Sequence, residues 1–180
     1  MKIFDLKKGA LIAPLFFILL SNSYAQTPAE RWYAVGYNFS QLGRNEQAFD
    51  WMLKSAAAGY APAQNNIGLS YLHGLGVEAN DKKAFEYFEK AAKQGLTYAQ
   101  SELAMLYYQG KGVEKNLDQA YDWWLGASEG GDEYAQFNLA SLLLERGDIK
   151  NAFFWFTQAK NNHHPNASEA LEQLKERYVE

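Results

Sequence analysis

Two blocks in the middle of the chain carry the same order of apolar, small and polar residues. Residues 63–98 and 99–134 are both 36 residues long, both begin Ala-Gln, and align without a gap. Shared positions include Ile67-Gly68 with Leu103-Ala104, Tyr71 with Tyr107, Gly74-Leu75-Gly76-Val77 with Gly110-Lys111-Gly112-Val113, and Ala84-Phe85 with Ala120-Tyr121. Repetition at a fixed period of this length is typical of stacked structural units.

The segments on either side continue the pattern with a shorter connection. Residues 31–62 and 135–166 keep the apolar and small positions but lack four residues of the Gly-Xaa-Gly-Val segment. From residue 167 only the first half recurs, with apolar residues at helical spacing: Ala167, Ala170, Leu171, Leu174 and Tyr178. The rest of that segment is polar, which predicts a helix at residues 167–179 that caps the stack.

Each repeat is predicted to form two helices. The first half of a repeat has a period of 3.6 residues, and Gly74 and Gly76 favour its end because glycine tolerates a left-handed backbone. The second helix should begin near Asn80, Asn116 or Asp148, whose side chains can cap free backbone N–H groups, and should stop by the glycine at the position of Gly95. No segment shows sustained strand alternation, so the fold class is all-α.

Small residues recur at one position of the first helix, where they would let the helices approach closely: Gly36, Gly68, Ala104 and Ala140. Aromatic residues recur in the second helix, at Trp51, Tyr87, Trp123 and Trp155. We expect these four aromatic side chains to fill the space beyond the small residues and to form the core.

The repeat pattern Ala-Xaa3-Leu-Gly-Xaa2-Tyr-Xaa2-Gly-Xaa-Gly-Val, followed by Ala-Xaa2-Trp-Tyr-Xaa-Lys-Ala-Ala-Xaa2-Gly, resembles the Sel1-like repeat, a relative of the tetratricopeptide repeat. The resemblance covers about residues 31–179. It implies a right-handed α-solenoid of four helix pairs plus the capping helix, with first helices lining a concave wall. It also implies a role in binding other proteins, as adaptors, sensor partners, export scaffolds or toxin antidotes.

The N-terminus has the three-part layout of a secretory signal peptide. Basic residues at positions 2, 7 and 8 precede an uncharged run over residues 10–20, and Ser23 and Ala25 are small residues before a cleavage site. The run is too short to span a bilayer, which needs about 20 residues. We therefore expect a signal peptide at 1–25 and a repeat domain at 26–180, exported most simply into a bacterial periplasm; a retained anchor is the alternative.

The composition excludes several classes of chemical site. The 180 residues include no cysteine and three histidines, which excludes a disulfide framework, thiolate metal sites and a cysteine nucleophile. The net charge is −4, and removal of residues 1–25 leaves 14 basic and 20 acidic residues, a charge of −6. That sign argues against a dedicated nucleic-acid surface, because such a surface must neutralise phosphates.

Other candidate groups have structural interpretations. The paired glycines lie between two predicted helices, whereas a dinucleotide loop joins a strand to a helix. We expect His163-His164 to lie in a solvent-exposed loop and the carboxylates Glu86, Glu89 and Glu145 to lie on outward helix positions. We therefore predict no cofactor, no metal site and no catalytic set.

The informative stripe is formed by the third, seventh and tenth residues of each repeat, which the register places on the concave wall. Their identities vary between repeats, whereas core positions do not. The candidate partner-binding residues are Tyr33, Tyr37, Asn65, Leu69, Leu72, Met105, Tyr108 and Phe137; Ser40, Ser101, Ser141 and Leu144 complete the set. Aromatic residues and Met are favoured interface anchors, so the stripe suits a helix or extended peptide laid in a groove. The alternative is that some of them only pack between adjacent first helices.

The sequence therefore predicts a non-catalytic, monomeric protein-binding module of the periplasm, with a protein or peptide partner, no nucleic acid and no stable membrane insertion after cleavage. One alternative is an immunity protein whose charge of −6 complements a basic toxin. A second alternative, a hydrolase of cell-wall material or β-lactam, would need a convergent catalytic set that the sequence does not provide.

Overall fold

The computed structural model describes residues 27–178, and the expected signal peptide at 1–25 lies outside them. The described residues form nine α-helices and no strand, in agreement with the predicted all-α class. The helices are α2 (Pro28–Gln41), α3 (Asn45–Ala57), α4 (Ala61–His73), α5 (Asp81–Lys93), α6 (Thr97–Gln109), α7 (Leu117–Glu129), α8 (Glu133–Glu145), α9 (Ile149–Asn161) and α10 (Ala167–Tyr178). No helix among the described residues is both long enough and apolar enough to cross a membrane.

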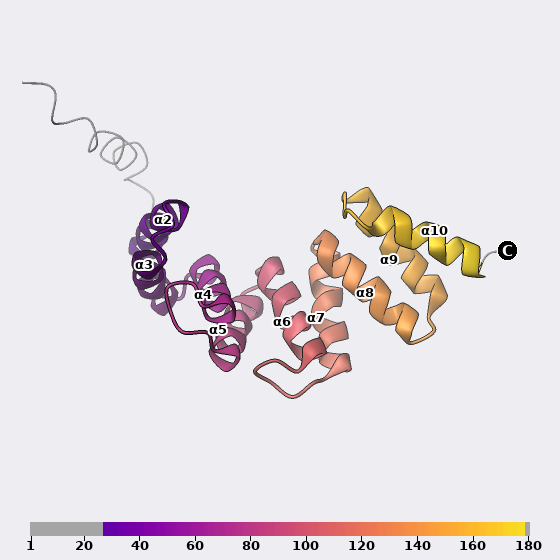
Figure 1. The fold of residues 1–180 in the computed structure, drawn as a ribbon, viewed down its shortest axis with the longest axis horizontal. Helices are drawn as coiled ribbons and strands as arrows, with labels where there is room; N and C mark the ends of the chain where they lie inside the picture. The colour runs from indigo at the N-terminus through magenta and orange to yellow at the C-terminus, as the bar shows by residue number, and fades with distance from the viewer. Residues whose placement is uncertain (1–26, 179–180) are drawn as a thin grey trace, which may run out of the picture.

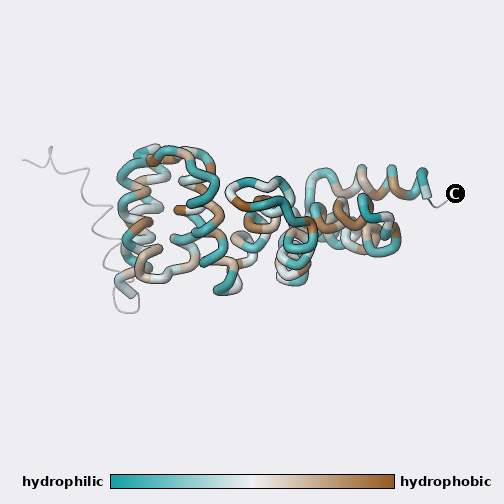
Figure 2. Tube along the Cα trace, turned by 90° about the horizontal axis from the view of Figure 1, so that it is seen from below, coloured by the Kyte–Doolittle hydropathy of each residue, from teal (hydrophilic) through white to brown (hydrophobic). Residues whose placement is uncertain are grey.

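The helices form an elongated array of pairs, α2/α3, α4/α5, α6/α7 and α8/α9, with α10 at the end (Figure 1). The principal contacts join helices that follow one another in the chain. The array bends into an arc with α6 and α7 near its middle (Figure 1). Hydrophobic and hydrophilic positions alternate along the helices, as expected when each helix buries one stripe against its neighbours (Figure 2).

The predicted helix boundaries are confirmed at the caps. The side chains of Asn80, Asn116 and Asp148 accept hydrogen bonds from the backbone N–H groups of Lys83, Gln119 and Asn151 at 2.9, 3.0 and 3.2 Å. Gly74 and Gly110 end α4 and α6 in the left-handed region, with φ of 70° and 71°. The first helix begins earlier than the repeat register, at Pro28, because Thr27 and Glu30 cap each other's backbone N–H groups.

The core register differs from the prediction by one residue. Trp51, Tyr87, Trp123 and Trp155 are only partly buried. The residues that follow them are the buried ones: Met52 at 4% exposure, Phe88 at 0%, Trp124 at 2% and Phe156 at 3%. These side chains cover the small residues of the first helices. A Cβ at Gly36 would lie 2.7 Å from Met52, and one at Gly68 would lie 2.8 Å from the Phe88 ring, so no larger side chain fits there without movement.

The predicted capping helix is present as α10. Ala167, Leu171 and Leu174 are buried against the array. Tyr178, which the pattern placed on the same inward stripe, is 44% exposed because it lies at the end of the last turn.

Candidate protein-binding surface

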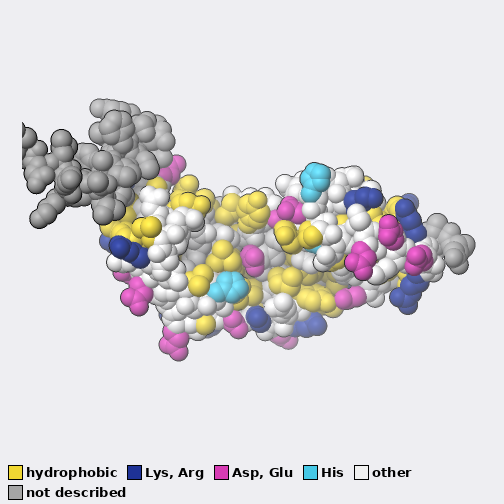
Figure 3. Space-filling view, turned by 45° about the horizontal axis from the view of Figure 1, so that its top comes forward, with side chains coloured by type: hydrophobic (Ala, Val, Ile, Leu, Met, Phe, Trp, Pro, Cys, Tyr) yellow, Lys and Arg dark blue, Asp and Glu magenta, His cyan; other side chains and the backbone are white. Residues whose placement is uncertain are grey.

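The twelve residues predicted to line the inner wall lie on α2, α4, α6 and α8, three to each helix. None of them is buried, whereas the core positions beside them, such as Ile67, Leu103 and Leu139, are fully buried. Tyr37 is the most exposed aromatic among them, at 47%. Figure 3 shows hydrophobic side chains exposed in patches along the middle of the array, with acidic side chains between them.

A tyrosine cluster forms the N-terminal end of this surface. The rings of Tyr33 and Tyr37 stack with centroids 6.3 Å apart, and Tyr60 meets Tyr33 edge-on at 5.3 Å. The Asn66 side-chain amide donates a hydrogen bond to the Tyr33 hydroxyl at 3.5 Å. Burial raises the pKa of the Tyr33 hydroxyl above its usual value. Tyr33 is thus held in place by its neighbours, and Tyr37 is the member most open to a partner.

In the second repeat, Leu69 and Leu72 are partly buried and pack against the first hydrophobic cluster, which includes Ile67 and Phe88. Asn65 on the same helix has its buried side-chain oxygen without a hydrogen-bond partner. These two leucines serve the core and also contribute exposed apolar surface, so both interpretations of the stripe apply to them.

Tyr108 in the third repeat is fixed by several contacts. Its ring lies 5.4 Å from that of Trp124, and its hydroxyl donates a hydrogen bond to Glu145 at 2.9 Å. The Lys115 ammonium group lies 5.4 Å from the ring centroid. Hydrogen bonding to the carboxylate of Glu145 raises the pKa of Tyr108. A fixed aromatic ring costs little conformational entropy when it binds, which suits a contact residue.

Phe137 in the fourth repeat belongs more to the packing than to a free surface. Its ring stacks on His164 at 4.2 Å with an interplanar angle of 15°, and it meets Phe156 edge-on at 5.2 Å. His164 is therefore 8% exposed, which corrects the prediction of a solvent-exposed loop for this residue, whereas His163 is exposed as predicted. Desolvation lowers the pKa of His164, and the carboxylates of Glu133 and Asp132 act against that shift.

Two carboxylates at the junction of the third and fourth repeats have raised pKa values. Asp132 is 5% exposed and caps α8 by accepting the Ala135 N–H at 2.6 Å. Burial raises its pKa, and burial also raises the pKa of the half-buried Glu102 on α6. His73 on α4 lowers the pKa of Glu102 and Asp132 raises it. No group of three or more residues that could hold a metal ion occurs among residues 27–178.

A row of glutamines that is not among the predicted functional residues joins neighbouring repeats. The side-chain amides of Gln64, Gln100 and Gln136 donate to the carbonyls of Ala56, Ala92 and Ser128, at 3.3, 3.4 and 3.0 Å. These carbonyls belong to the last turn of the preceding second helix, and each also accepts a hydrogen bond from the backbone N–H of the glycine three residues later in the chain. The Ala-Gln dipeptide at the same place in each block was the signal for this role.

Comparisons with known proteins identify the repeat. The family model described as Sel1 repeat matches residues 29–60, 61–96, 97–132 and 133–164. Each match begins two residues before the register used above. No curated protein matches the chain.

Solved structures agree. A Sel1 repeat protein from Oxalobacter formigenes is 30% identical with a TM-score of 0.73, over 77% of this chain and 59% of that one. The c5321 protein, described as a protective antigen of uropathogenic Escherichia coli strains with an SLR fold, is 28% identical with a TM-score of 0.78, over 83% of this chain and 34% of that one. MamA shares the fold at 15% identity, with a TM-score of 0.57 and coverage of 87% and 89%. The chain thus spans about 59% and 34% of the length of the first two proteins.

Proposed function

Because the chain belongs to the Sel1 repeat family, whose arrays generally act as non-catalytic scaffolds for protein–protein interaction, we propose that it binds a segment of a partner protein along its inner surface. The partner lies against α2, α4, α6 and α8, with Tyr37, Met105 and Tyr108 as contact residues. Binding is reversible docking without chemistry, by a monomeric array. The N-terminal segment supports export, so the site of action is the bacterial periplasm.

One observation carries this proposal. The inner positions of all four repeats remain partly exposed although eight of the twelve are aromatic, Leu or Met, while the adjacent core positions are buried. In a monomer an apolar stripe of this kind costs solvation free energy, and a partner that covers it recovers that free energy.

The test is site-specific photo-cross-linking in living cells. A photoreactive amino acid at Met105 or Tyr37 on the inner helices should give a discrete cross-linked product, and the product should disappear when Tyr108 is also replaced by Ala. The matched control is the same amino acid at Phe154, a 50% exposed residue on α9, which belongs to the second helices. Products from Phe154 alone, with none from the inner helices, would contradict the proposal.

Export has its own measurement. Fractionation and mass analysis of the cellular protein should find it in the periplasm, beginning at Gln26. Recovery from the membrane with residues 1–25 retained would contradict cleavage and leave the binding surface unaffected.

The charge of −6 after removal of residues 1–25 favours a second candidate, an immunity protein that binds a basic toxin. The same cross-linking separates the two roles by the partner that it identifies. A strongly basic effector, bound with an affinity that falls steeply with salt, indicates immunity, and an envelope protein indicates an adaptor.

A further inference from the structure

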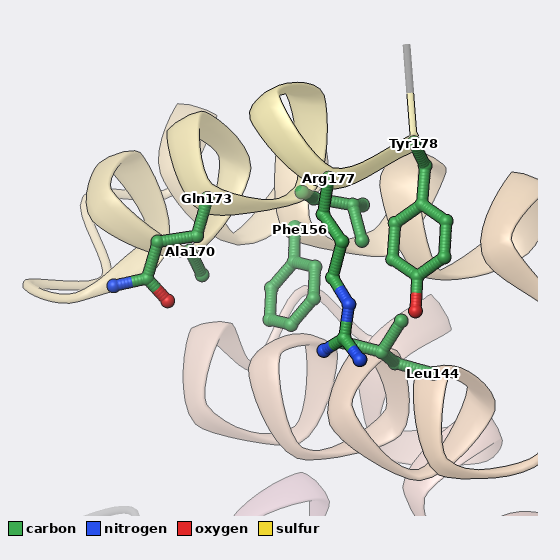
Figure 4. Close-up of a pocket in the computed structure, with 7 residues that line it drawn as sticks. Leu144, Phe156, Ala170, Gln173, Arg177 and Tyr178 are labelled. Carbon is green, nitrogen blue, oxygen red and sulfur yellow. The ribbon is translucent and has the colours of Figure 1, made fainter. Parts of the chain in front are cut away.

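A pocket of about 170 Å³ lies where α10 closes the array. It is lined by Leu144 of α8, Phe156 of α9, and Ala170, Gln173, Leu174, Arg177 and Tyr178 of α10. Figure 4 shows the Arg177 guanidinium and the Tyr178 hydroxyl reaching from α10 toward Leu144, with the Phe156 ring beside them. Leu144 is the last inner position of the fourth repeat, so the pocket continues the inner surface described above.

The lining of the pocket combines an apolar floor with one cation. Leu144, Phe156, Ala170 and Leu174 supply the apolar part, and Arg177 supplies the charge. No carboxylate among residues 27–178 forms an ion pair with Arg177, whose guanidinium carbon lies 5.4 Å from the centroid of the Tyr178 ring. A guanidinium group binds a carboxylate through two parallel hydrogen bonds, and the exposed Arg177 side chain can be reached by such a group from solvent.

The volume limits the size of the occupant. Pockets for drug-sized molecules and cofactors have volumes of about 300–1,000 Å³, so this one suits a single side chain. Arg177 and the apolar side chains line the same small pocket, so a single residue of the partner must contact both. The C-terminal residue of a polypeptide carries an apolar side chain and a carboxylate on the same carbon atom. An internal Asp or Glu carries the carboxylate in place of the apolar group.

We propose that this pocket receives the C-terminal residue of the partner, with its apolar side chain on Leu144, Phe156 and Leu174 and its carboxylate on Arg177. This inference rests on the proposed function. It specifies that the C-terminal end of the partner segment lies at α10, and therefore the direction in which the segment runs along the inner surface. Phe137 connects the two regions, since its ring lies on the inner stripe and 5.2 Å from that of Phe156. The pocket thus selects partners that end in an apolar residue near this end of the array.

The test uses a display library of random octapeptides with free C-termini, selected against the purified protein produced from the full chain. Selected peptides should end in Leu, Ile, Val, Met or Phe. A representative peptide is then synthesised as the free acid and as the C-terminal amide, and the binding of both forms is measured by fluorescence anisotropy. We expect the acid to bind at least tenfold more tightly than the amide.

Two variants locate the effect. Arg177→Gln should weaken binding of the acid at least tenfold and leave binding of the amide unchanged. Lys175→Gln removes one positive charge from the same helix, but Lys175 faces the Phe153 ring at 6.0 Å rather than the pocket, so both peptides should bind it as they bind the wild type. The acid–amide comparison on the wild-type protein needs no variant and holds even if Arg177→Gln unfolds.

Several results would overturn the inference: equal binding of acid and amide, selected peptides without an apolar last residue, or no selected peptide. Peptides that bind equally as acid and amide but lose affinity with Tyr37→Ala would refute the C-terminal pocket and support the inner surface. A failure of the inner surface itself is detected separately, by the cross-linking from Met105 and Tyr37.

Discussion

Trp123 and Trp124 are adjacent, and their replacement by alanine tests the core register directly. Trp124 is 2% exposed, in a cluster with Ala104, Leu139 and Leu142, whereas Trp123 is partly exposed at the edge of both clusters. Removing a fully buried tryptophan costs about 3–5 kcal/mol of the free energy of unfolding, through lost burial and the cavity left behind. The indole N–H of Trp124 has no hydrogen-bond partner, so no polar interaction adds to that figure.

Trp124→Ala should therefore lower the melting temperature by about 6–20 °C, at about 2–4 °C per kcal/mol for a chain of this size. The Trp123 side chain is partly exposed in the folded protein, so Trp123→Ala removes less buried apolar surface. It should lower the free energy of unfolding by about 1–2 kcal/mol. Urea unfolding followed by circular dichroism at 222 nm avoids the fluorescence change that either substitution causes. An equal or larger loss for Trp123→Ala would refute the register and the core described here.

Three further predictions concern the glycine turns, His164 and Tyr37. Gly112→Ala should destabilise the array by about 2 kcal/mol or more, because φ is +69° and the added Cβ would overlap the carbonyl oxygen of Asp81; Gly131→Ala, at φ +90° with open space around it, should cost only about 1 kcal/mol by urea titration. Burial lowers the pKa of His164 below its usual 6.5 in the folded protein, so the unfolded chain binds a proton at this residue more readily. His164 therefore contributes its full share of the free energy of unfolding above pH 6.5, and this share decreases as the pH falls through and below that value. His164→Phe should flatten this part of the profile in melts between pH 5 and 8, and an unchanged profile would contradict the role of His164. Tyr37→Ala should leave the melt within about 0.5 kcal/mol of wild type, because the side chain is 47% exposed, and a larger loss would show that it belongs to the core.

The sequence predicted the helix pairs well because their signals are local. The caps at Asn80, Asn116 and Asp148 and the turn at Gly74 depend on a few consecutive residues, and the structure has all of them. The partial exposure of first-helix positions such as Tyr37 agrees with the variation of residue types there, whereas positions such as Leu69 and Phe137 also pack against the core.

The core register could not be decided by period alone because aromatic residues occur in neighbouring pairs, such as Tyr87-Phe88 and Trp123-Trp124. Adjacent residues differ by about 100° around a helix, so both can border a broad apolar face, and the period does not show which of the two is buried. The residue types distinguish the outer member of each pair from the buried member. The outer member of each pair is Trp or Tyr, which tolerate a polar environment at one end, whereas the buried member is Met, Phe, Trp or Phe.

The environment of His164 and the terminal pocket needed the structure, because both depend on contacts between helices distant in sequence. His164 is buried by Phe137 and Tyr134, which lie 27 and 30 residues earlier in the chain. Arg177 faces Leu144 only because α10 docks on the last helix pair. No local pattern in either segment reports these contacts.

The uneven loop lengths follow from what each loop touches. Gly76 and Gly112 lie against the first turns of α3 and α5, so the Gly-Xaa-Gly-Val connection of one repeat packs on the second helix of the repeat before it. Among residues 27–178, no helix pair precedes the first repeat for such a loop to contact. The fourth repeat has a preceding helix pair, but its short loop cannot contact that pair in the same way.

At the junction before the fourth repeat, Arg146 at the end of α8 forms an ion pair with Asp118 in the first turn of α7 at 2.9 Å. The Asp118 side chain is 88% exposed, so this pair contributes at most about 1 kcal/mol. The junction before the fourth repeat therefore lacks the backbone packing of the two earlier ones. In partial unfolding followed by hydrogen exchange, we expect the fourth pair to separate from the third before the first three pairs separate from one another. Protection that is lost first between the second and third pairs would contradict this account of the loops.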